Sequence, residues 1–307
     1  KMRFHSYLDA KGIAPEELNG AICYDGIANL VRNGHWFESA DHDLAEGNSW
    51  VDATLYQNAG ATQSFELACA LAHAHEYLFH LKQKKQFRFS VSVGSDFFGE
   101  IAKLRALRKL WPLVANQYLA DTSIRIHAVN SELNQSPLDA YNNMLRSTTQ
   151  GMSAVIGGCN SLTLGGYNTT FENTSDFSER IARNQQLIFK EESYLDKVAD
   201  MSAGSYYIEH LSDAIAAKAW EEFKIIEQKG GFLAALRANY IQERIMQQAH
   251  HLVNEFREQK IILVGVNKFQ NKMEANAAKV ERTQMPGGII ETIKPLFLSD
   301  HLVKENA

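Results

Sequence analysis

The stretch that decides the fold class is residues 87–129, FRFSVSVGSDFFGEIAKLRALRKLWPLVANQYLADTSIRIHAV. It opens with alternating apolar and polar residues (FRFSVSV), continues with a helical run, and closes with a second alternating segment (IRIHAV). Two strands separated by a helix pair in parallel through a right-handed crossover. The stretch therefore predicts a β-α-β unit of an α/β protein.

The same alternation of strand and helix continues on both sides of this unit. Further strand-like runs occur at residues 20–27, 50–56 and 161–164, and helical runs at residues 64–82 and 138–156. After residue 164 the pattern predicts only helices, over residues 177–197, 211–229 and 232–258, while the short run 261–266 is compatible with a final strand. The tail from residue 271 has little periodicity and is expected to lie extended on the surface or on a partner.

The helical repeat also predicts which faces of the late helices are buried. Asp176 and Glu179 form a capping-box-like start for the first of them. Its buried face is expected to carry Phe177, Ile181, Asn184 and Ile188, and that of the next helix Ile215, Ala219, Phe223 and Ile226.

Composition excludes several classes of protein. A hydrophobic content of 45% and a charged content of 22% are typical of a globular chain, and the net charge of -5 gives no nucleic-acid footprint. The short basic run at residues 82–85 is read as a solvated helix end. No apolar run approaches the roughly 18 residues of a membrane span, and Cys23, Cys69 and Cys159 suggest free thiols in a reducing cytoplasm.

The histidines do not have the spacing of a metal site. His73, His75 and His80 fall on one predicted helix without the i,i+4 pairing of a zinc site, so decorated helix surface is the favoured interpretation. The adjacent His250 and His251 point in different directions and are interpreted in the same way. We predict no metal ligand among these five histidines.

A resemblance to a known family rests on residues 176–220, DFSERIARNQQLIFKEESYLDKVADMSAGSYYIEHLSDAIAAKAW. This run closely resembles the last part of the barrel domain in the methylmalonyl-CoA mutase family, the adenosylcobalamin-dependent acyl-CoA mutases. The resemblance implies that residues 1–270 form the carboxy-terminal part of a TIM (β/α)8 barrel with trailing helices, and residues 271–307 a tail. About five parallel strands are predicted where a closed barrel needs eight. Such a half-barrel exposes an edge and is expected to pair with a partner or a second copy.

Strand alternation places polar side chains on the lumen side of this barrel. Apolar residues of each strand pack under the helices, so Arg88 and Ser90 of one strand and Arg125 and His127 of the next should point inward. Two alternatives remain open for these four side chains. They form either a polar layer whose hydrogen bonds are satisfied within the protein, or a binding site for a ligand. In the family, an Arg-x-Ser meets the thioester chain of CoA, and Arg88-x-Ser90 resembles it; Arg125-x-His127 resembles the Arg-x-His of the next strand. The resemblance thus implies a vestigial acyl-CoA contact near the strand ends where barrel sites form.

The block at residues 52–62, DATLYQNAGAT, departs from the family at its working residue. Aligned on Ala59-Gly60-Ala61-Thr62, it carries Thr54 at the family's tyrosine and Leu55 at the histidine that lies against the thioester carbonyl. Leucine can neither donate a hydrogen bond nor titrate. We therefore predict no catalytic residue in this chain.

Other family positions have also lost their chemistry. Val129 stands where catalytic chains carry a substrate-facing glutamine. Residues 163–169, TLGGYNT, replace the family's cofactor-facing segment, and the cobalt-ligand signature Asp-x-His-x-x-Gly is absent from all 307 residues. The resemblance then implies that adenosylcobalamin is bound by a large partner subunit and not by this chain.

Three interpretations follow from these departures. The first is the small, non-catalytic chain of the family's heterodimeric members, which interconvert methylmalonyl-CoA and succinyl-CoA by a radical rearrangement. The second is a catalytic acyl-CoA mutase of altered specificity, with another residue in place of the histidine. The third, an unrelated barrel enzyme, is disfavoured by residues 176–220.

Overall fold

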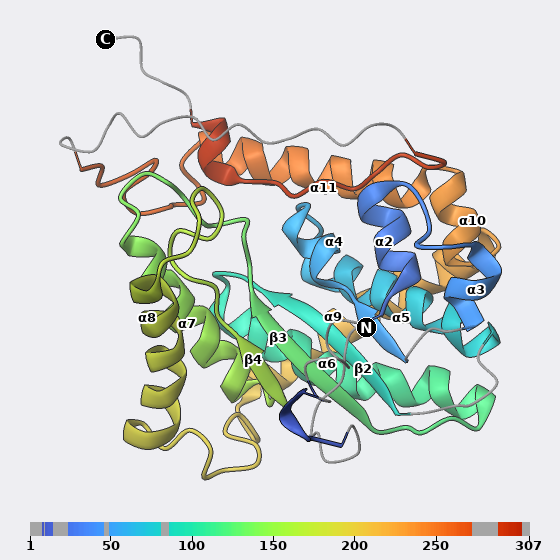
Figure 1. The fold of residues 1–307 in the computed structure, drawn as a ribbon. Helices are drawn as coiled ribbons and strands as arrows, with labels where there is room; N and C mark the ends of the chain where they lie inside the picture. The colour runs from blue at the N-terminus through green and yellow to red at the C-terminus, as the bar shows by residue number, and fades with distance from the viewer. Residues whose placement is uncertain are drawn as a thin grey trace.

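A computed structural model describes residues 8, 10–14, 24–45, 49–80, 86–271 and 288–302. The centre of this part of the chain is a four-stranded sheet in the order β1-β2-β3-β4, with every neighbouring pair parallel (Figure 1). The strands are β1 (Trp50–Asp52), β2 (Phe87–Val93), β3 (Ile124–Asn130) and β4 (Ser161–Thr163). The predicted α/β class with parallel pairing is confirmed.

Three helices connect the strands and pack on one face of the sheet: α5 (Gln63–His80), α6 (Phe97–Ala115) and α7 (Asn142–Ile156). The alternation in β2 explains this packing, because Phe87, Phe89, Val91 and Val93 are fully buried beneath the helices. The indole of Trp111 on α6 lies 4.6 Å from the ring of Phe87 and 5.2 Å from that of Phe89.

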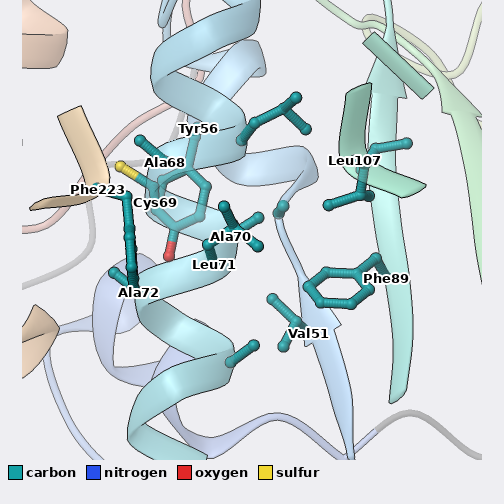
Figure 2. Packing of buried hydrophobic residues seen from close by; sticks show 14 of the residues in the cluster. Val51, Tyr56, Ala68, Cys69, Ala70, Leu71, Ala72, Phe89, Leu107 and Phe223 are labelled. Carbon is teal, nitrogen blue, oxygen red and sulfur yellow. The ribbon is translucent and has the colours of Figure 1, made fainter. Parts of the chain in front are cut away.

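A further helix, α9 (Tyr206–Gln228), forms an outer layer against α5 and α6. Figure 2 shows α5 between the two layers, with Leu71 on the side of Val51 and Phe89 and with Cys69 and Ala72 on the side of Phe223. Each predicted apolar position of α9 is buried: Ile215, Ala219, Phe223 and Ile226. The helical repeat therefore identified this face correctly.

The remaining elements flank these layers. They are α2 (Gly26–Asn33), α3 (Ala40–Ala45), α4 (Thr54–Asn58), η2 (Asn116–Tyr118), α8 (Asp176–Leu187) with a π-helical turn (Ile188–Glu192), α10 (Phe232–Arg237), α11 (Tyr240–Arg257) and η4 (Leu298–His301).

Several predicted boundaries are wrong. Of the run 20–27, residues 20–23 lie outside the described part of the chain, and Asp25 caps the start of α2 instead of continuing a strand. The run 50–56 ends as a strand at Asp52, because α4 begins two residues later. Residues 261–266 contribute only an isolated bridge at Val264. The run 232–258 is broken by Asn239, whose φ of 58° is left-handed.

The buried face of α8 is also not the predicted one. Its cap is Ser175, which forms a capping box with Ser178, one residue before the expected start. The helix buries Ser178, Ala182 and Gln185, and the Gln185 amide donates to the Met144 carbonyl at 2.6 Å. The predicted stripe is largely outward, with Phe177 45% and Ile188 43% exposed.

Residues 288–302, which we call the strap, lie extended over the rest of the molecule until η4. Backbone N–H groups of the strap donate to carbonyls of three other segments: Ile289 to Gly34, Ile293 to Val31, Leu296 to Asn58 and Leu298 to Leu133. Figure 1 shows the strap in red, running alongside α11. Gly34 has a φ of 77°, and a Cβ there would lie 2.7 Å from the Cα of Gly288, so the two backbones cross where neither can carry a side chain. Ile293, Phe297 and Leu298 of the strap are buried against the rest of the molecule, and the division of the chain at residue 270 stays a prediction.

Candidate functional site

The four predicted site residues lie together on the face of the sheet opposite α5, α6 and α7. The register pairs Arg88 with Arg125 and Ser90 with His127 on neighbouring strands. The Arg88 guanidinium lies 5.8 Å from the ring centre of Trp50, whose indole N–H donates to Ser90 Oγ at 2.8 Å. We call Arg88, Ser90, Arg125 and His127 the polar row.

His127 is the most fixed member of the polar row. Its Nδ1 lies 2.8 Å from Ser161 Oγ, and its Nε2 lies 3.2 Å from Thr163 Oγ1, so β4 holds both ring nitrogens. Burial lowers the pKa of His127, and the carboxylate of Asp52 opposes that shift only in part. The ring is therefore neutral at neutral pH, and it can donate one hydrogen bond and accept another without adding charge.

The arginines are less constrained. Arg125 is exposed and donates to Gln86 Oε1 at 3.3 Å, while Arg88 is half-buried. Each is the second residue of its strand, so each lies near the amino end of the sheet. The strand parity is as predicted, but the expected position towards the carboxyl ends is wrong for these two side chains.

The turn after β1 places Leu55 in the hydrophobic core. Leu55 is the second residue of α4 and is 6% exposed. Thr54 beside it donates its hydroxyl to Asp52 Oδ1 at 2.6 Å and accepts from Arg32 at 3.2 Å. The local sequence thus fixes the turn through Asp52 and Thr54 but offers no proton donor at position 55.

A buried charge cluster beneath the same turn was not anticipated from the sequence. Lys103 Nζ lies 2.6 Å from both Glu66 Oε2 and Glu100 Oε2 and donates to Gln57 Oε1 at 3.1 Å, with all three charged side chains inaccessible. Burial raises the pKa of Glu66 to about 7, against the opposing effect of Lys103. For Lys103, burial alone would lower the pKa, but Glu100 and Glu66 together raise it. The sequence signal for this cluster was the charge of Lys103 within the apolar face of α6 and of Glu66 within the apolar face of α5.

A second buried network corrects the interpretation of the histidines. His73 is fully buried, with Nε2 3.0 Å from Asp25 Oδ1 and Nδ1 3.0 Å from the Tyr56 hydroxyl. Tyr77 also donates to Asp25, at 2.7 Å. Surface decoration is therefore wrong for His73, whose role is to tie α5 to the start of α2.

The other histidines lie at or near the surface. His75 is half-buried, with Nδ1 2.8 Å from Glu227, whereas His80, His250 and His251 are exposed. Among the described residues, no group of three or more His, Cys, Asp or Glu side chains could hold a metal ion. Within the same residues, every helix is too short or too polar to serve as a transmembrane span.

The carboxyl edge of the sheet is closed by the protein's own hydrogen bonds. The Gly165 N–H donates to Asn130 Oδ1 at 2.7 Å, and Asn58 Oδ1 accepts from Ser92, Ser131 and Glu132. A Cβ on Gly166 would lie 2.9 Å from Ser178 Oγ, so this glycine packs against the start of α8. Gly165 and Gly166 therefore serve packing at this edge of the sheet.

Comparison with known proteins identifies the fold family. The family model described as methylmalonyl-CoA mutase matches residues 4–294. The chain belongs to the methylmalonyl-CoA mutase family.

Individual relatives include both kinds of subunit. The chain is 36% identical to a protein of Porphyromonas gingivalis named methylmalonyl-CoA mutase small subunit, over 96% of this chain and 52% of that protein. It is 35% identical to the methylmalonyl-CoA mutase of Rhizobium meliloti, over 87% of this chain and 41% of that protein. It is 30% identical to the protein of Propionibacterium freudenreichii subsp. shermanii named methylmalonyl-CoA mutase large subunit, over 87% of this chain and 40% of that protein. The chain spans about half the length of the curated relatives it matches.

Proposed function

We propose that this chain acts as the small, non-catalytic subunit of an adenosylcobalamin-dependent methylmalonyl-CoA mutase. The large partner subunit would interconvert methylmalonyl-CoA and succinyl-CoA. Relatives in Porphyromonas gingivalis and Streptomyces virginiae carry the small-subunit name. The proposal includes a division in which residues 1–270 form the carboxy-terminal portion of a barrel with trailing helices and residues 271–307 form a tail.

The observation that carries this proposal is the burial of Leu55. The resemblance implies a histidine against the thioester carbonyl at this position, and general acid–base assistance needs a group that donates or titrates. The side chain at position 55 does neither, and it is packed into the core at 6% exposure. Thr54 beside it does not replace it, because the Thr54 hydroxyl is already engaged by Asp52 and Arg32.

The residues at the carboxyl edge do not fit adenosylcobalamin. Gly165 and Gly166 offer no side chain, and Asn130 Oδ1 is occupied by the Gly165 N–H. We therefore assign the cofactor to the partner subunit. The free thiols of Cys69 and Cys159 suit the reducing cytoplasm in which such an enzyme would work.

The polar row supports a narrower proposal, a vestigial acyl-CoA contact at Arg88, Ser90, Arg125 and His127. Cationic and hydroxyl groups on one sheet face suit carbonyl and phosphate oxygens. The exposed Arg125 guanidinium lies nearest to solvent and is the member best placed to meet a phosphate.

The test is to purify this chain and a large mutase subunit separately and to measure turnover of methylmalonyl-CoA with added adenosylcobalamin. We expect no turnover by this chain alone, and a defined complex with the large subunit in sedimentation. Turnover by this chain alone would overturn the proposal in favour of a catalytic acyl-CoA mutase. Absence of any complex would remove the subunit assignment.

A further inference from the structure

A groove lies between α11 and the strap, away from the polar row. Its volume is about 680 Å³. The floor is apolar, formed by Ile245, Met246, Ala249 and Val253 of α11 together with Pro295 and Leu296 of the strap. The walls are held in place, because Gln242 donates to the Glu291 carbonyl at 3.0 Å and Leu296 donates to Asn58.

The charged groups of the groove are separated along its length. Glu243 lies in the first turn of α11 and Glu291 beside it on the strap, whereas Arg257 is the last residue of the helix. At a rise of about 1.5 Å per residue, the stretch of this helix from Glu243 to Arg257 spans roughly 20 Å. The groove therefore has an acidic end and a basic end.

The basic end carries groups that the protein does not pair. In the described part of the chain, neither Arg257 nor His250 makes a hydrogen bond or ion pair, although both line the groove. His301 lies near these groups. Burial lowers the pKa of His301, Arg257 and His250 lower it further, and Asp300 opposes this shift. Arg257 thus carries a permanent positive charge with no ion-pair partner among the described residues, beside two imidazoles that can donate hydrogen bonds, and this combination favours an anionic ligand.

The shape of the groove favours a polypeptide over a small molecule. Pockets for small ligands bury about 70–90% of the ligand surface. Here the floor residue Met246 is 51% exposed and Arg257 lies in the open, so the groove encloses little. A length of roughly 20 Å corresponds to about six residues of extended chain at about 3.3 Å each.

We propose that this groove binds a short, extended acidic segment of another polypeptide. Its carboxylates lie at the Arg257 end, and its apolar side chains lie on the floor formed by Met246, Ala249 and Val253. This inference does not depend on the mutase assignment.

The experiment is an NMR titration of the whole chain with a pool of capped hexapeptides that carry two Asp or Glu residues at one end and Leu, Val or Met at the other four positions. A second pool carries Asn or Gln in place of the acids, and inorganic phosphate is the third probe. The signals to follow are the imidazoles of His250 and His301 and the methyl of Met246, with the imidazole of the exposed His35 as a control outside the groove.

We expect the acidic pool to shift the three groove signals saturably and to leave His35 unchanged. Arg257→Gln should weaken binding about fivefold, since a solvent-exposed ion pair contributes up to about a factor of five. Arg237→Gln is the matched control, because Arg237 is also an exposed arginine at a helix end but lies outside the groove.

Three results would overturn the proposal. One is the absence of saturable shifts with the acidic pool. The second is equal affinity for the amide pool, or for the acidic pool with Arg257→Gln. The third is a response of the histidines to phosphate and to the acidic pool alike while the Met246 methyl stays unchanged, which would reduce the groove to a simple anion site.

Discussion

The polar row and the turn after β1 belong to the same sheet region, yet they differ in the chemistry of their side chains. The polar row retains each side chain by which it resembles the family, and β1 and β4 hold it through Trp50, Ser161 and Thr163. The turn is supported by the buried Lys103 cluster and carries the apolar Leu55 at the position where the proposed function sets a missing histidine. Different contacts therefore hold the scaffold of the turn, the polar row and the side chain at position 55, so a substitution can change one of them without the others.

The largest expected effect comes from removing the support of the turn. Lys103→Met leaves Glu66 and Glu100 buried without their cation, which should cost about 3–5 kcal/mol of the free energy of unfolding. Urea denaturation measures it. The control is Lys109→Met, at a surface lysine paired with Asp213, where we expect a loss below about 1 kcal/mol. A similar small loss for both variants would show that the cluster does not support the turn.

Restoring the reactive residue alone should harm the protein without restoring activity. Leu55→His places a polar ring in the core and should cost about 1–3 kcal/mol of the free energy of unfolding. We expect no turnover of methylmalonyl-CoA, because Thr54 and Val129 also differ from the family pattern. Leu55→Met, which nearly conserves volume, should cost less than about 1.5 kcal/mol. Turnover by the histidine variant would contradict the view that the chemistry is lost at more than one position.

The acyl-CoA contact proposed for the polar row can be tested by binding. If it contacts acyl-CoA, Arg88→Met removes a charged hydrogen-bond donor, and affinity for propionyl-CoA should fall about tenfold, or about 1.4 kcal/mol. Titration calorimetry measures the change, with Arg180→Met on α8 as an exposed control outside the row. Equal affinity in the two variants would leave the row as a structural polar layer.

The smallest expected effect is a pH dependence away from both regions. The hydrogen bond from His75 to Glu227 raises the pKa of His75, against the effect of burial. A raised pKa in the folded state stabilises the protein fully below about pH 6.5, the unfolded value, and the contribution is lost as pH rises through the folded value. Relative to His75→Gln, the native protein should be more stable by about 0.5 kcal/mol at pH 5.5 and by less at pH 9. A difference that does not change with pH would exclude this role.

The sequence predicted features that depend on neighbours along one element. Strict alternation in β2 separated Phe87 and Phe89 from Arg88 and Ser90, and the helical repeat identified the buried face of α9. The sequence did not predict contacts between residues that lie far apart along the chain. His73 meets Asp25, 48 positions away, and Lys103 meets Glu66, 37 positions away. For α8, the face that is buried is set by α7, because Met144 and Ser147 accept hydrogen bonds from the Gln185 amide.

The strap also has a consequence for the order in which the molecule opens. Its amide protons at Ile289, Ile293, Leu296 and Leu298 are held by carbonyls of α2, α4 and the loop after β3. Hydrogen exchange at these four sites thus requires either local peeling of the strap or loosening of the segment beneath it. Peeling from one end would give a gradient of exchange rates along the strap, whereas a single shared rate would mean that α2 and the carboxyl edge of the sheet open as one cooperative unit.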